Sequence, residues 1–170
     1  MRDRSKVNRR TPILTAGLSD PGQARTGTGG QDAVTINATI QYFRAHGADQ
    51  YVDGYGIHQY PWQATAQQRK TALENNGVAA CGNGRPGQPK PCWITEWGFP
   101  NADKTCPIDD AARTALVREY MGYFHTLAAA GRLVGTMYFS WDSDPWSKTV
   151  DRDSVYRCGA LTSAGEAALR

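Results

Sequence analysis

The chain has 170 residues, of which 40% are hydrophobic, enough for one domain with a substantial buried core. No apolar run approaches the roughly 18 residues that a membrane-spanning helix needs, so the sequence predicts no membrane-spanning protein. The first ten residues contain five Lys or Arg and one Asp, so they carry +4, and the other 160 residues sum to −1. A short basic segment, residues 1–11, on a near-neutral body argues against a nucleic-acid-binding protein, which needs a broad basic face.

Four cysteines lie in loop-like stretches rich in Gly, Pro and Asn: Cys81, Cys92, Cys106 and Cys158. No pair has the CxxC spacing of a zinc site, and the three histidines are scattered, which favours disulfides. Of the three possible pairings, the short separation makes Cys81 with Cys92 the easiest, which leaves Cys106 with Cys158. Disulfides indicate an oxidising compartment, so we expect a secreted or periplasmic protein, although the first residues lack the apolar core of a signal peptide.

Four short stretches rich in β-branched and aromatic residues predict strands: residues 12–18, 52–58, 92–97 and 135–141. Their centres are about 40 residues apart. Eight such units need about 320 residues, which is within the range of a closed (β/α)₈ barrel. This chain holds four.

A helical pattern follows each predicted strand. The first has Asp32 as N-cap and Gly47 at its end, and a weaker pattern covers about residues 65–75. The strongest lies between Asp109 and Gly131, and the last begins near residue 163. This alternation indicates parallel strands with right-handed crossovers, so we expect one α/β domain over residues 1–170, the (β/α)₄ half of a TIM barrel.

The predicted strands end in the segments GIHQYPW, WITEWGFP and YFSWDSDPW, which place aromatic side chains beside polar or acidic ones. The active site of a parallel α/β barrel gathers at these ends. Sugars present apolar faces for stacking and hydroxyls for hydrogen bonding, so this combination predicts a carbohydrate site. The candidate sugar-binding residues are His58, Tyr60, Trp62, Trp97, Trp141, Asp142 and Trp146. Trp93 points away from its strand neighbours and is expected in the core.

Glu96 is the strongest candidate for a catalytic residue. A lone carboxylate at the end of an apolar strand costs several kcal/mol to bury unless it is solvated or used. The other three glutamates, Glu74, Glu119 and Glu166, lie in predicted helices, where we expect solvated charges.

The three strand ends resemble strands six, seven and eight of the clan A glycoside hydrolases, retaining enzymes built on a (β/α)₈ barrel. The segment WITEWGFP is the most specific part of this resemblance, which implies that Glu96 is the nucleophile. By the same resemblance His58 and Tyr60 hold the nucleophile and the sugar, and Trp141 is the platform beneath the sugar. Within the clan, the chain is most similar to the cellulase-like family five and the xylosidase-like family thirty-nine. The resemblance begins at about Pro12 and covers only the C-terminal half of the barrel.

The second carboxyl group of a retaining glycosidase has no counterpart in this sequence. Such an enzyme needs two carboxyl groups about 5 to 5.5 Å apart. The family carries its acid/base in an Asn-Glu pair at the end of strand four, and this dipeptide does not occur here. Asp20, Asp142 and Asp144 are the acids near strand ends, but Asp has a shorter reach. We therefore expect the nucleophile-bearing half of an exported enzyme, weak or inactive alone, whose leader and acid/base are missing.

Two alternatives remain open at this stage. In the first, the chain is a non-catalytic carbohydrate-binding module that uses Trp62, Trp97, Trp141 and Trp146 as a platform. In the second, the half-barrel pairs with another copy or with a separate N-terminal half through edge strands at residues 13–16 and 137–141. Nothing in the sequence indicates a cofactor or a metal, because the spacing in WDSDPW matches no calcium loop.

Overall fold

The structure, a computed structural model, describes residues 11–19, 34–103, 105–142 and 152–170. Its main sheet has four strands in the order β1 (Leu18–Ser19), β2 (Tyr55–His58), β3 (Cys92–Trp97) and β4 (Leu133–Tyr138). Every neighbouring pair is parallel, so the predicted α/β class and strand direction are confirmed. A small antiparallel pair, β5 (Tyr156–Arg157) and β6 (Ala160–Leu161), follows near the C-terminus.

The first and last predicted strands are shifted or shortened. Outside β1, the segment near residue 14 forms only an isolated bridge between Leu14 and Gly54. The ladder is interrupted because the side-chain hydroxyl of Thr15, and not a backbone carbonyl, accepts the N–H of Gly56. Strand β4 begins two residues earlier than predicted and ends at Tyr138, three residues before Trp141.

Several helices begin where a threonine side chain accepts a backbone N–H of the first turn. Helix α1 (Ile36–Ala45) is capped by Thr35, whose hydroxyl accepts the N–H of Ala38, so the prediction of an Asp32 cap is wrong; Asp32 lies outside the described residues. Gly47, with φ of 81°, ends this segment and leads into a 3₁₀ turn, η1 (Ala48–Gln50).

Threonine side chains also cap two of the helices that follow in the described part of the chain. Helix α2 (Ala66–Ala72) has a capping box between Thr65 and Gln68 and continues into a π-helical turn, η2 (Leu73–Gly77). Helix α3 (Ala111–Ala129) is the longest, and the short α4 (Ser163–Ala168) is capped by Thr162. None of the helices in the described part of the chain is long and apolar enough to cross a membrane.

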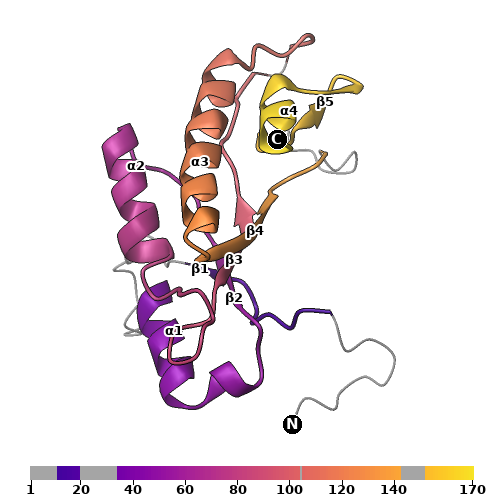
Figure 1. Ribbon diagram of the computed structural model, residues 1–170. Helices are drawn as coiled ribbons and strands as arrows, with labels where there is room; N and C mark the ends of the chain where they lie inside the picture. Colours follow the sequence, from indigo (N-terminus) through magenta and orange to yellow (C-terminus); the bar gives the residue numbers. More distant parts are fainter. Residues whose placement is uncertain (1–10, 20–33, 104, 143–151) are drawn as a thin grey trace, which may run out of the picture.

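One face of the sheet packs against the helices and forms the core. Figure 1 shows α1, α2 and α3 along the sheet and α4 beside the upper part of α3. The strand residues buried on this face alternate with residues of the other face, as a pleated strand requires. They are Tyr55, Ile57, Cys92, Ile94, Trp97 and Leu133, and they meet Ile36, Ile40, Leu73, Val117, Tyr120, Phe124 and Leu127.

Both predicted disulfides are present. Cys81–Cys92 joins the segment after η2 to the first residue of β3, with Cα atoms 5.5 Å apart. Cys106–Cys158 joins the segment after β3 to the turn between β5 and β6, with Cα atoms 5.9 Å apart. Because all four cysteines are paired, they are not zinc ligands, and the chain has the disulfides typical of proteins from oxidising compartments.

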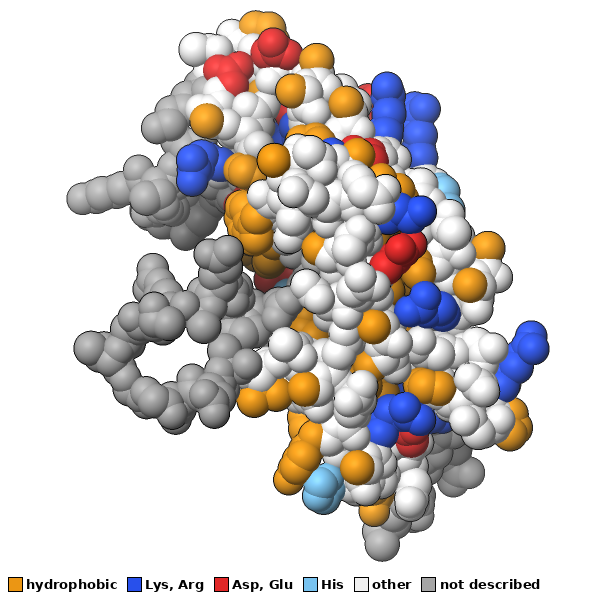
Figure 2. Space-filling model, turned by 90° about the vertical axis from the view of Figure 1, so that its left-hand side faces the viewer, with side chains coloured by type: hydrophobic (Ala, Val, Ile, Leu, Met, Phe, Trp, Pro, Cys, Tyr) orange, Lys and Arg blue, Asp and Glu red, His pale blue; other side chains and the backbone are white. Residues whose placement is uncertain are grey.

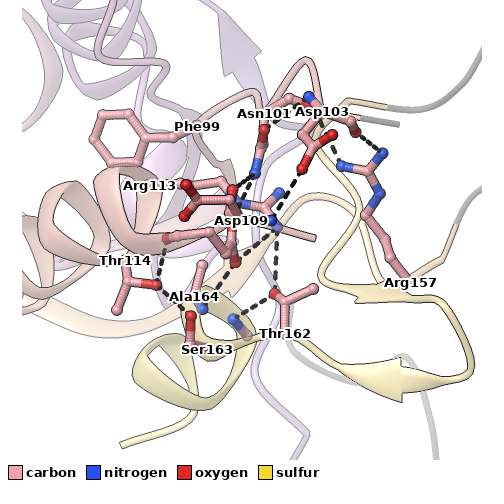
Figure 3. Close-up of polar contacts among 12 residues, drawn as sticks. Phe99, Asn101, Asp103, Asp109, Arg113, Thr114, Arg157, Thr162, Ser163 and Ala164 are labelled. Atoms are coloured by element: carbon pink, nitrogen blue, oxygen red, sulfur yellow. Dashed lines mark hydrogen bonds and ion pairs between the residues drawn. The ribbon is translucent and has the colours of Figure 1, made fainter. Parts of the chain in front are cut away.

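A buried ion pair fixes the C-terminal segment to α3. The Arg113 guanidinium donates to the Asp110 carboxylate at 2.6 and 3.0 Å, and both side chains are 2% exposed. Arg113 also donates to the carbonyl of Ser154, and the Ala164 N–H donates to Asp110, as Figure 3 shows in part. The pair therefore ties the beginning of α3 to the segment before β5 and to α4.

The same close-up shows a second link from this segment. Arg157 on β5 donates to the backbone carbonyls of Asn101 and Asp103, in the loop that follows β3. Together with the Cys106–Cys158 disulfide, these bonds hold the β5–β6 pair against that loop.

Figure 2 views the side on which α1 and α2 lie. Lys and Arg side chains are scattered over this face among neutral, hydrophobic and acidic ones. Basic side chains therefore do not merge into one continuous field on the part of this face that is described.

Candidate active site

A bulge in β3 places Glu96 at the carboxyl edge of the sheet. Ile57 pairs with Ile94, but the next residue of β2, His58, pairs with Glu96, so Thr95 is an extra residue in β3. A bulge of this kind re-aims the side chains that follow it. Glu96 and His58 therefore lie opposite each other at the ends of neighbouring strands, with side chains 34% and 22% exposed.

Two side chains from the end of β2 converge on one oxygen of Glu96. The Tyr60 hydroxyl donates to Oε2 at 2.8 Å, and Nδ1 of His58 lies 3.3 Å from the same oxygen. Both of these contacts of the Glu96 side chain involve Oε2. The structure thus brings together the three residues that the sequence places in one site.

The end of β1 orients the His58 ring. Ser19 Oγ lies 3.0 Å from Nδ1 of His58, the nitrogen that also faces Glu96. On the other side the ring rests directly on Gly17, because a Cβ at that position would lie 1.9 Å from Nε2. Sequence reasoning missed both residues; the signal was the pairing of a glycine and a hydroxyl at the end of the first predicted strand.

Aromatic side chains form a wall next to the carboxylate. Trp62 is 70% exposed and stacks on Tyr60, with ring centroids 5.7 Å apart. Phe139, just after β4, meets Tyr60 edge-on at 6.5 Å and is also exposed. Phe139 was not among the predicted sugar-binding residues. These three rings offer apolar surface beside the hydrogen-bonding groups of Glu96 and His58, a combination suited to a sugar ring.

The prediction that Trp97 contacts the sugar is wrong. Trp97 is fully buried on the helix side of the sheet, where its ring meets Tyr120, Phe124 and Tyr138. The bulge explains the difference. Thr95 is an extra residue, so the side chains of Thr95 and Glu96 both lie away from the helix side and Trp97 returns to it.

Trp93 also differs from its prediction as a core residue. It is half-buried on the face away from the helices, where its ring lies against Gly54 and Gly135 of the flanking segments. A Cβ at residue 135 would lie 2.9 Å from this ring, so the glycine makes room for the indole.

Trp141 and Asp142 form a second group. Trp141 is 58% exposed and stacks on Tyr156 of β5 at 5.8 Å, with nearly parallel rings. The backbone of Asp142 forms an isolated parallel β-bridge with Tyr156. Asp142 also lines a hollow of about 260 Å³ with Arg157 and the Cys106–Cys158 disulfide. The polar contacts of the Glu96 side chain in the described part of the chain are with Tyr60 and His58. Trp146, Asp20 and Asp144 lie outside the described residues.

No protein-family model matches the chain, and no curated protein matches it in sequence. In three dimensions it is similar to the Faecalibacterium prausnitzii beta-glucuronidase, with a TM-score of 0.50 and 11% identity, over 75% of this chain and 23% of that one. It is also similar to fungal beta-1,4-galactanases (TM-score 0.48, 16% identity, 78% and 42% covered). The catalytic core of xylanase A gives a TM-score of 0.49 at 14% identity, with 78% and 44% covered.

The chain therefore spans less than half the length of each of these enzymes. At such identities the likeness concerns the fold alone. The comparison of folds rests on the glucuronidase, which has the higher TM-score. The sheet of four parallel strands covered by helices has the architecture of part of a TIM barrel.

Proposed function

We propose that this chain carries the nucleophile of a retaining β-glycoside hydrolase, and that the nucleophile is Glu96. The observation that supports this most is the convergence of the Tyr60 hydroxyl and His58 Nδ1 on one oxygen of a carboxylate at a strand end. A carboxylate held by two neighbours, with its other oxygen directed to no partner in the described part of the chain, is prepared for nucleophilic attack.

In the proposed reaction, Oε1 of Glu96 attacks the anomeric carbon through an oxocarbenium-like transition state. The bond between that carbon and the leaving oxygen breaks, and the leaving group departs with the electron pair. Water then attacks the anomeric carbon, and the bond from that carbon to Oε1 breaks. The sugar leaves with its anomeric configuration retained, the carboxylate is restored, and one proton of the water passes to the solvent. Tyr60 and His58 fix the orientation of the carboxylate during both steps.

The acid/base is the missing part of this mechanism. Among the described residues, the side chains that contact Glu96 are Tyr60 and His58, and neither is a carboxylic acid. We propose that a carboxyl group outside the described residues protonates the leaving oxygen in the complete enzyme. Without it, the chain depends on substrates whose leaving groups need no protonation.

The substrate class is a β-linked carbohydrate. The names of the structural neighbours refer to β-glucuronides, β-1,4-galactan and xylan. The exposed rings of Trp62 and Phe139 provide surface for stacking against pyranose rings of this kind. The family assignment to the cellulase-like family five or the xylosidase-like family thirty-nine, and secretion of the enzyme, belong to this proposal.

Hydrolysis of aryl β-glycosides tests the proposal. We expect 2,4-dinitrophenyl β-glycosides to be cleaved and 4-methoxyphenyl β-glycosides of the same sugar to be cleaved far more slowly, because only the first leaving group departs without protonation. Glu96→Gln should abolish the activity, and Glu74→Gln, which removes an exposed carboxylate on η2, serves as the matched control. Activity that survives in Glu96→Gln would show that another residue is the nucleophile.

A non-catalytic carbohydrate-binding module is the second candidate, and the exposure of Trp62 and Trp141 favours it. Trp97 does not belong to this platform, because it is buried, and Trp146 lies outside the described residues. Quenching of tryptophan fluorescence by soluble β-linked oligosaccharides, lost in Trp62→Ala and Trp141→Ala and accompanied by no cleavage of any aryl glycoside, would support this candidate over the enzyme.

A further inference from the structure

The loop between β2 and α2, residues 59–65, carries Tyr60 and Trp62 and is anchored by an arginine behind it. Arg69 on α2 donates from Nη1 to the backbone carbonyls of Gln63 at 3.1 Å and Ala64 at 3.0 Å. Within the loop, the Trp62 N–H donates to the Tyr60 carbonyl at 3.1 Å. Short-range bonds therefore connect the Arg69 guanidinium to the backbone of Tyr60.

Glu119 on α3 holds the same guanidinium at two further points. Nε and Nη2 of Arg69 donate to the two carboxylate oxygens of Glu119 at 3.0 and 2.6 Å. The side chains are only 8% and 22% exposed, so the expectation of a solvated charge at Glu119 is wrong. The hydrogen bond to Glu119 raises the pKa of Arg69 despite its burial. A two-point pair of this kind fixes the position of the guanidinium as well as its charge.

The next residue of α3 connects the pair to β3. The Tyr120 hydroxyl donates to the carbonyl of Arg69 at 3.2 Å, and the Tyr120 ring stacks on Trp97 at 6.3 Å. Trp97 directly follows Glu96. Glu119 and Tyr120 thus contact both sides of the site, the loop after β2 through Arg69 and the end of β3 through Trp97.

We propose that Arg69 and Glu119 are positioning residues of the active site, which hold the loop at residues 59–65 so that the Tyr60 hydroxyl stays on Oε2 of Glu96. The Arg69–Glu119 pair lies behind the loop, and the hydrogen bonds described above are not to Glu96, the Tyr60 hydroxyl or the His58 ring. Its effect on the loop follows from the geometry alone, and its effect on catalysis rests on the function proposed above.

Helix α2 also provides a matched comparison. Lys70 and Glu74 form an ion pair one residue along the chain from Arg69, but their atoms are 3.9 Å apart and both side chains are nearly half exposed. Exposed pairs of this kind contribute little to stability or order. Glu74→Gln therefore removes the same charge as Glu119→Gln without releasing the loop.

The first experiment measures amide hydrogen exchange of the peptide covering residues 59–66 in the full chain. Loss of a charged hydrogen-bond partner is expected to speed this exchange about tenfold in Glu119→Gln. Arg69→Lys, which keeps the charge but cannot reach both carbonyls and both carboxylate oxygens, should do the same and replaces Glu119→Gln if that variant does not fold. Exchange no faster than in Glu74→Gln, in variants with native near-ultraviolet circular dichroism, would overturn the proposal.

The second experiment follows covalent labelling by 2,4-dinitrophenyl 2-deoxy-2-fluoro-β-glycosides. Glu119→Gln should slow labelling about tenfold when Tyr60 is present and have less than a twofold effect in a Tyr60→Phe background, because the pair acts through Tyr60. Equal slowing in both backgrounds would overturn the catalytic role of the pair. If the wild-type chain is not labelled at all, the proposed function fails, and the exchange measurement alone decides whether the pair holds the loop.

Discussion

The Tyr60 hydroxyl donates a 2.8 Å hydrogen bond to Oε2 of Glu96, which links the loop after β2 to the end of β3 across 36 residues of sequence. This bond fixes which oxygen of Glu96 Tyr60 engages. Under the function proposed above, the position of Tyr60 therefore affects how fast Glu96 reacts.

Replacing Tyr60 with Phe removes the donor and keeps the ring that stacks on Trp62. We expect labelling of Glu96 by an activated 2-fluoro glycoside to slow about 10- to 100-fold, because hydrogen bonds to charged groups are the stronger class. Tyr51→Phe, at an exposed tyrosine, is the control and should leave the rate unchanged. Equal rates for Tyr60→Phe and wild type would remove Tyr60 from the site.

Gly17→Ala tests the support of the His58 ring. A Cβ at residue 17 would lie 1.9 Å from Nε2, so the ring must turn and lose its contacts with Ser19 and Glu96. We expect shifted imidazole resonances of His58 in nitrogen-15 spectra, with little change in global stability because Gly17 is exposed.

Gly122→Ala is the matched control for that variant. The added methyl meets no atom within 4 Å, and the position is inside α3. This substitution should raise the free energy of unfolding by about 0.5 to 1 kcal/mol and leave the His58 resonances in place. Unchanged His58 resonances in Gly17→Ala would contradict the packing described here.

The Asp110–Arg113 pair predicts sensitivity to acid. Burial alone raises the pKa of Asp110, but hydrogen bonds from Arg113 and Asn101 and from the Ala164 N–H outweigh it and hold the pKa below its ordinary value. A carboxyl group with a lowered pKa stabilises the fold above its unfolded pKa of about 4 and loses this contribution as the pH falls through its folded value.

We therefore expect the free energy of unfolding, measured in urea, to fall as the pH is lowered below about 4. Asp110→Asn should lower the free energy of unfolding by about 3 kcal/mol at neutral pH, because it leaves the buried Arg113 without its counter-charge. The free energy of unfolding of this variant should also change less with pH below about 4. Glu166→Gln, at an exposed position on α4, is the control. If the free energy of unfolding fell equally steeply with pH in Asp110→Asn and wild type, another carboxyl group would cause the loss of stability in acid.

The Cys106–Cys158 disulfide should contribute mainly by restricting the unfolded chain, because both cysteines are exposed in the folded structure. For a sequence separation of 52 residues, the chain-entropy relation gives about 4 kcal/mol. Urea unfolding of the Cys106→Ala/Cys158→Ala variant measures this loss. A loss below about 1 kcal/mol would mean that the unfolded state is already restricted in this region.

The sequence was sufficient for the features that depend on local chemistry. Periodicity predicted α3 because its buried residues follow one helical stripe, and the short separation of Cys81 and Cys92 predicted their pairing. The alternation of strand and helix patterns predicted the parallel sheet.

Features that depend on strand register or on distant partners could not be predicted from the sequence. A strict alternation along β3 would put Glu96 on the helix side with Cys92 and Ile94 and Trp97 on the opposite side, but the extra residue at Thr95 exchanges the two. The partner of Glu119 is 50 residues away on another helix, so no local pattern distinguished this carboxylate from a solvated one. Phe139 follows β4 and reaches the site only because the sheet brings it beside Tyr60.

The most direct test of the central claim is to incubate the oxidised chain with 2,4-dinitrophenyl 2-deoxy-2-fluoro-β-glycosides of glucose, galactose, xylose and glucuronic acid and to map the product by peptide mass spectrometry. The account predicts one sugar ester on the peptide containing Glu96, released dinitrophenol in equal amount, and no adduct in Glu96→Gln. An adduct on another residue, or no adduct with any of the four sugars, would contradict it.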